Sequence, residues 1–73
     1  MRFRDMVDTF APNINIRIMN GEDILTEVGG AYAASLDKEI FDAEVYRIDT
    51  YHERTEWEYG VIEADGIEIT IYL

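Results

Sequence analysis

Residues 67–73 read Ile-Glu-Ile-Thr-Ile-Tyr-Leu, and this closing stretch is the clearest strand signal in the chain. Its apolar side chains occupy alternate positions, which places them on one face of a strand and the polar side chains on the other. Residues 13–18, Asn-Ile-Asn-Ile-Arg-Ile, show the same alternation. Asn20-Gly21 follows at once and predicts a type I′ hairpin turn into another strand over residues 23–28. The fold is therefore built on a sheet.

The middle of the chain predicts further strands. Residues 43–51 and 56–62 are rich in the Val, Tyr, Ile and Thr that suit a pleated, half-buried surface. Ala64-Asp65-Gly66 carries an Asp-Gly turn signal and predicts a hairpin into the closing strand. Since strands usually pair with their neighbours in sequence, we expect a small antiparallel sheet of four to five strands.

Two short helices are predicted to cover that sheet. Four apolar residues between Phe3 and Phe10 recur at helical spacing, and Pro12 ends this opening helix. Ser35 is a candidate N-cap for a second helix over residues 36–41, after Gly29-Gly30 has broken the preceding strand. The chain is thus expected to be a single α+β domain spanning residues 1–73.

Length and composition narrow the class of protein. A chain of 73 residues has room for one small core. The absence of cysteine excludes a disulfide framework, a thiolate zinc site and a cysteine nucleophile. The opening residues lack the apolar stretch of a signal peptide and no run is long enough to span a bilayer, so we expect a soluble, cytoplasmic protein.

Candidate catalytic and ligand-binding residues are sparse. His52 and Ser35 are the only histidine and serine, and they fall on different predicted elements, with His52 in a solvated hairpin. Glu56 and Glu58 resemble a carboxylate pair for a divalent cation, but no calcium-loop spacing surrounds them. Gly29-Gly30 lacks the following glycine and helix of a phosphate-binding loop. We therefore expect no enzymatic activity, no metal and no cofactor.

Charge is the most informative remaining feature. The chain carries a net charge of −10, which disfavours direct binding to nucleic acid or to anionic membranes and favours a basic protein partner. The acidity is concentrated in residues 22–73, which hold three basic and fourteen acidic side chains. One or two exposed aromatic residues could anchor such a partner. The expected partner-binding residues are the carboxylates of the later strands and the final turn: Glu56, Glu58, Glu63, Asp65 and Glu68.

The segments RFRDMVDTF, NINIRIMNGED and SLDKEIFDAEVYRID, followed by the closing apolar strand, resemble small acidic proteins encoded in phages and prophages of Gram-positive bacteria. The resemblance covers most of the chain. It implies an accessory protein of a mobile element, and some such proteins are anti-CRISPRs that mimic DNA or occupy the basic groove of a nuclease. It implies no catalytic residue.

Two functional hypotheses follow. In the first, the chain is a stoichiometric inhibitor whose acidic surface occupies the basic groove of a nucleic-acid-binding host defence protein, such as a CRISPR nuclease. In the second, it is a structural or assembly module, such as a homodimer joined through an edge strand, and its charge only maintains solubility. Carboxylates gathered on one face favour the inhibitor, and carboxylates scattered around the molecule favour the module.

Overall fold

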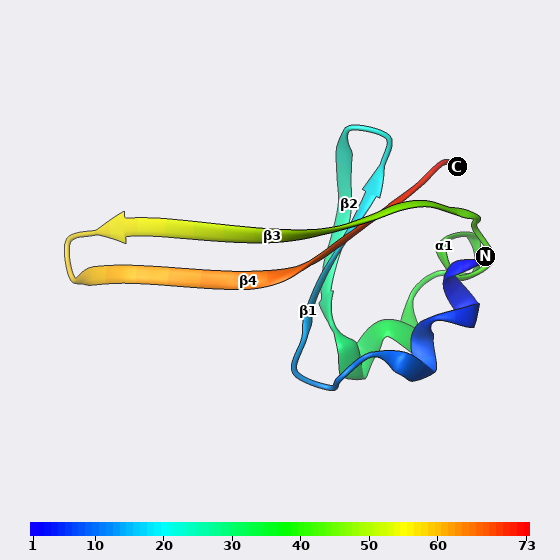
Figure 1. The fold of residues 1–73 in the computed structure, drawn as a ribbon, viewed down its shortest axis with the longest axis horizontal. Helices are drawn as coiled ribbons and strands as arrows, with labels where there is room; N and C mark the ends of the chain where they lie inside the picture. Colours follow the sequence, from blue (N-terminus) through cyan, green and yellow to red (C-terminus); the bar gives the residue numbers. More distant parts are fainter.

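A single four-stranded sheet organises the computed structural model, which describes all 73 residues (Figure 1). The strand order is β2-β1-β4-β3. The two outer pairs are antiparallel, whereas the central strands β1 and β4 run parallel. The α+β class is confirmed, but the expectation of an antiparallel sheet is wrong at its centre. The strands are β1 (Asn15–Asn20), β2 (Asp23–Gly29), β3 (Val45–Trp57) and β4 (Gly60–Ile71).

Burial of isoleucine explains the parallel pair. The strands β1 and β4 carry the two most regular apolar alternations of the chain. Their register places Ile16 opposite Ile67 and Ile18 opposite Ile69, all on the core face. Placing these two strands side by side buries their apolar faces together, and this outweighs the tendency of strands to pair in sequence order.

The first predicted hairpin is confirmed with a different turn. Asn20 pairs with Asp23, so the two central residues are Gly21 and Glu22 rather than Asn20 and Gly21. Of these two central residues, Gly21 alone has a positive φ, of 62°. A glycine at the first central position is typical of a type II′ turn and not of the type I′ turn expected from Asn-Gly.

The second hairpin lies elsewhere than predicted. β3 continues through the expected break at residues 52–55, and the chain reverses at Glu58-Tyr59. Asp65-Gly66 is an interior part of β4, where Gly66 pairs with Tyr51 on β3 and Asn15 on β1. A Cβ atom at Gly66 would lie 2.8 Å from Tyr51 Cε1 and closer still to the Asn15 carbonyl oxygen. The glycine is therefore required by close approach and not by a turn.

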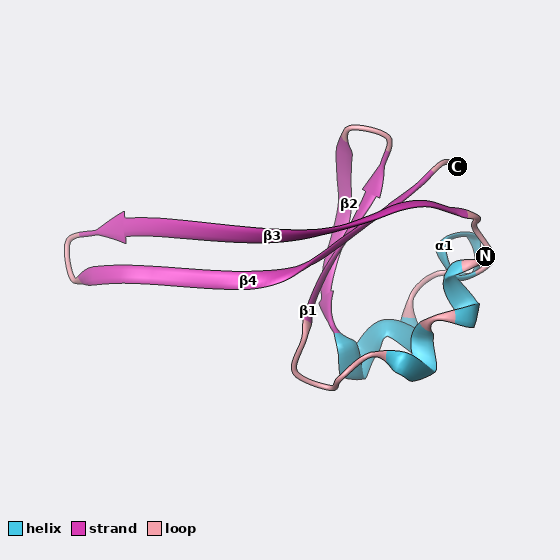
Figure 2. Cartoon of the chain, in the orientation of Figure 1, coloured by secondary structure: helices cyan, strands magenta, loops and turns pink.

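Short helical segments cover the core face of the sheet (Figure 2). The prediction of a single opening helix is wrong, because two 3₁₀ turns take its place. Phe3 and Met6 are nevertheless buried, as expected. Ser35 is not the predicted N-cap, since the later helix begins after Asp37. No helix has the length and apolar character needed to cross a membrane. The segments are η1 (Phe3–Asp5), η2 (Val7–Thr9), η3 (Gly30–Ser35) and α1 (Lys38–Phe41).

The core lies between these helical segments and the central strands. Nine buried apolar residues form one cluster, and Phe3 and Ala33 from the helical segments are completely inaccessible. Phe3 packs against Phe10 and Phe41 with ring centroids 5.9 and 6.5 Å apart. All of this packing sits at one end of the molecule, and the far half of the β3–β4 hairpin extends away from it (Figure 1).

Candidate partner-binding arm

A two-stranded arm is the most distinctive surface of the molecule. β1 accompanies β4 only from Gly66 to Ile71, so residues 52–65 of the β3–β4 hairpin have no third strand beside them. This arm projects from the body along the longest dimension of the molecule, which measures 41 Å (Figure 1). Every arm residue except Ala64 is exposed. The arm is thus available to a partner from both faces.

Strand pairing divides the arm into two faces, because directly opposed residues of an antiparallel pair point to the same side. His52 opposes Asp65, Arg54 opposes Glu63 and Glu56 opposes Val61. We call this side the charged face. The other side carries Thr55 opposite Ile62 and Trp57 opposite Gly60, with Glu53 and Ala64 nearer the body, and we call it the apolar face.

The five predicted partner-binding residues are only partly brought together. Glu56, Glu63 and Asp65 share the charged face of the arm. Glu58 lies in the turn at the tip. Glu68 lies on the body, on the opposite side of the sheet from Ile67 and Ile69, whose side chains pack on the core. The carboxylates are therefore gathered at the arm but do not form one continuous row.

Neighbouring bases neutralise part of this acidity. Arg54 Nη2 lies 3.0 Å from Glu56 Oε1. His52 Nδ1 hydrogen-bonds with Asp65 Oδ1, and this bond, helped by the negative charge of Asp65, raises the pKa of His52. Glu63 and Glu58 take part in no ion pair. The arm as a whole keeps one arginine against five carboxylates.

His52 has a carboxylate, and not a nucleophilic side chain, as its hydrogen-bonding partner. It lies in the middle of β3, within the β3–β4 hairpin, and it is exposed, in keeping with the expected solvated hairpin histidine. Its hydrogen-bonding partner is Asp65, and the only serine of the chain lies on η3 in the body. The molecule contains no group of three or more histidine, cysteine and carboxylate side chains arranged to hold a metal ion.

The apolar face ends in an aromatic pair. Trp57 and Tyr59 contact each other edge to face, with ring centroids 5.1 Å apart and an interplanar angle of 75°. They remain 53% and 79% exposed. Ile62 on the same face and Val61 on the charged face are also exposed. Exposed aromatic side chains at a protruding tip are typical of anchors in protein interfaces.

One arginine joins the base of the arm to all four strands. Arg17 on β1 bonds to Glu27 on β2 at 2.7 Å and to Glu53 on β3, and it lies 3.6 Å from Glu68 on β4. Its guanidinium carbon stacks 4.2 Å above the ring centroid of Tyr51. The hydrogen bonds that Arg17 donates to Glu27 and Glu53 raise the pKa of Arg17 above its ordinary value.

The arrangement around Arg17 was not predicted from the sequence. Its signal was the single charge between Ile16 and Ile18, which strand alternation places on the face opposite the core. Arg17 and its neighbours border a shallow groove of about 330 Å³. Because Arg17 already binds the carboxylates there, the cluster links the base of the arm to the body and leaves no free cation for an anionic ligand. No known protein family, curated protein or solved structure matches this chain.

Proposed function

We propose that the chain is a non-enzymatic inhibitor that inserts its acidic arm into the basic, nucleic-acid-binding groove of another protein. The observation that carries the proposal is the arm itself: residues 52–65 project from the body, are all exposed except Ala64, and hold five carboxylates against one arginine. Negative charge on a protruding element is suited to entering a groove lined by lysine and arginine.

The spacing of the carboxylates supports this mode of binding. Glu63 and Asp65 lie on one face two residues apart, which is about 6.8 Å along a strand. Phosphates follow one strand of B-DNA at a rise of about 3.4 Å, so these two carboxylates repeat at about twice the axial rise between phosphates. The feature that they share with a phosphate backbone is repeated negative charge on one side, which basic residues of a groove can pair with.

The aromatic tip adds an apolar contact to the electrostatic one. Charge complementarity mainly raises the rate of association, whereas buried aromatic anchors slow dissociation. Trp57 and Tyr59 stand beside Glu56 and Glu58 at the end of the arm. The class of target we propose is a nucleic-acid-binding defence protein such as a CRISPR nuclease, in keeping with the resemblance to phage and prophage accessory proteins, with the chain acting in the cytoplasm of the bacterial host.

Charge reversal in two matched variants tests the proposal. The tagged chain is used to capture partners from a nuclease-treated lysate of a Gram-positive host, and association with the captured protein is followed by stopped flow. The arm variant changes Glu56, Glu58 and Glu63 to Lys. The control changes three exposed acids of the body, Asp8, Glu22 and Glu39, to Lys, which alters the net charge equally.

We expect the arm variant to associate about tenfold more slowly than the control, because steering depends on where the charge lies. Rising salt should weaken binding of the wild type, since screening shortens the reach of exposed charges to about 8 Å at physiological ionic strength. Equal rates for the two variants, or an affinity that salt does not change, would contradict the proposed function.

A further inference from the structure

β3 is an edge strand, and most of its outer side is open. It lies at one end of the sheet order and pairs with β4 alone. A β-bulge between Val45 and Arg47 interrupts its first residues. From Arg47 to Trp57 the strand is regular, and its side chains are exposed except at Asp49 and Tyr51, which are half-buried. Eleven consecutive residues therefore present an unpaired edge.

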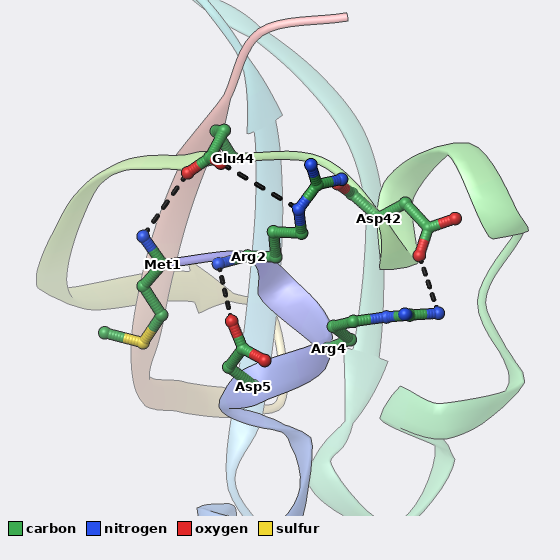
Figure 3. A network of polar contacts seen from close by, with 6 residues as sticks. All are labelled: Met1, Arg2, Arg4, Asp5, Asp42 and Glu44. Carbon is green, nitrogen blue, oxygen red and sulfur yellow. Dashed lines mark hydrogen bonds and ion pairs between the residues drawn. The ribbon is translucent and has the colours of Figure 1, made fainter.

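The beginning of the same edge is closed by the N-terminus (Figure 3). The Val45 amide donates to the Met1 carbonyl oxygen at 2.8 Å, and Arg2 forms an isolated bridge with Glu44. The Met1 ammonium group and the Arg2 guanidinium both reach the Glu44 carboxylate, at 3.3 and 3.9 Å. These contacts occupy residues 44 and 45 and define where the open edge begins.

The open edge has only some of the devices by which proteins usually protect such strands: five of its eleven residues are charged. Residues 47–57 contain no proline and no lysine, and the bulge lies before them. A two-stranded ribbon is also marginally stable in water, and a third strand is normally needed for independent stability. The outer half of the hairpin therefore has both room for another strand and a physical reason to gain one.

We propose that a second copy of the chain fills this edge, with the two β3 strands running antiparallel and His52 at the twofold axis. The length of the open edge favours this register. A twofold pairing that uses every residue from Arg47 to Trp57 on both copies must be centred on the residue midway between them, which is His52.

The side chains are complementary in this register. Arg47 lies opposite Trp57 of the second copy, which suits a cation–π contact, and Thr50 lies opposite Arg54. A shift of the axis to Tyr51 would oppose Asp49 and Glu53 on both sides, and a shift to Glu53 would shorten the pairing to residues 49–57. Like charges directly opposed across strands are destabilising. Each His52 at the axis is already paired with its own Asp65.

The proposed dimer does not depend on the proposed inhibitor function. The dimer joins two four-stranded sheets into a single eight-stranded sheet. The charged face and the apolar face of each arm stay exposed. Because each copy carries a net charge of −10, salt should favour the dimer by screening repulsion. Salt should weaken binding to a basic partner, so the two proposals respond to salt in opposite directions.

Sedimentation equilibrium of the isolated chain tests the proposal. We expect a reversible monomer–dimer equilibrium that shifts toward the dimer at higher salt. Thr50→Glu places a carboxylate opposite Arg54 in both symmetry-related pairs, and it should lower the dissociation constant of the dimer about 2- to 30-fold. Thr50→Arg should raise the dissociation constant by a similar factor. A monomer at all concentrations and salt levels, or a dimer indifferent to both Thr50 variants, would overturn the proposal.

The register is tested by a spin label on Thr55→Cys, which is the only cysteine of that variant. With the axis at His52, the two labelled positions lie about 20 Å apart along the strands, and an axis at Thr50 would place them about 34 Å apart. A measured separation near the shorter value supports the proposal. A longer separation, or the absence of a dipolar coupling in a sample shown to be dimeric, would contradict it.

Discussion

Replacing Gly66 by Ala tests why a glycine stands at this point in β4. A Cβ atom there would lie 2.7 and 2.8 Å from the hydroxyl oxygen and Cε1 of Tyr51, and closer still to the Asn15 carbonyl oxygen. Ordinary van der Waals contact begins near 3.4 Å. The Tyr51 ring must therefore swing outward by about half an ångström or more, and β1 must separate from β4 where their ladder begins. Overpacking of this kind costs about 1–3 kcal/mol of the free energy of unfolding.

Urea unfolding followed by far-ultraviolet circular dichroism measures this cost. A second variant, Gly66→Asn, separates the explanations. If Gly66 occupied a hairpin turn at positive φ, Asn would be tolerated better than Ala, because Asn adopts left-handed backbone conformations more readily. Close approach predicts the reverse, since Asn is larger. We expect stability to fall from Gly to Ala to Asn; Asn at least as stable as Ala would refute the reasoning.

Three further predictions concern the core, the arm and the cluster at its base. Phe3→Ala should cost about 3–5 kcal/mol in urea unfolding because Phe3 is fully buried, whereas Tyr59→Ala at the exposed tip should change stability little. In an NMR titration, the pKa of His52 should lie above 6.5 and should fall when Asp65 is changed to Asn. The stabilisation from that pair is present below the unfolded pKa of about 6.5 and is lost as the pH rises through the folded pKa. Arg17→Met should speed amide hydrogen exchange in the arm relative to β1, and Arg17→Lys should not restore protection, because one ammonium group cannot replace the guanidinium contacts.

Local patterns predicted the elements of the sheet well. The alternating isoleucines of residues 13–18 and 67–73 lie in β1 and β4, and Gly29-Gly30 marks the end of β2. Burial of Phe3 and Met6 was also predictable, because spacing reports the buried side whether the backbone is α-helical or 3₁₀. These features depend on neighbouring residues, and the sequence contains that information directly.

Features that depend on distant contacts were not predictable in the same way. Asp65-Gly66 carries a turn signal, but the glycine is needed because β1, β3 and β4 approach one another closely at this point. That approach involves residues far apart in the chain. The arm was not predicted, because the strands were expected to end near Tyr51 and to resume at Glu56. That break was expected because only charged and polar residues lie between the two. All five predicted carboxylates lie on the β3–β4 hairpin, but the turn at Glu58-Tyr59 places Glu58 at the tip and leaves the other four in the strands, with Glu68 on the body.

Competition with nucleic acid tests the central claim most directly. A fluorescently labelled oligonucleotide is bound to the captured partner, and its anisotropy is followed as the chain is added. If the arm mimics nucleic acid, the wild-type chain should release the oligonucleotide when one chain has been added per binding site of the partner. The variant with Glu56, Glu58 and Glu63 changed to Lys should release far less. A ternary complex that keeps the oligonucleotide bound while the chain binds the partner would contradict the account.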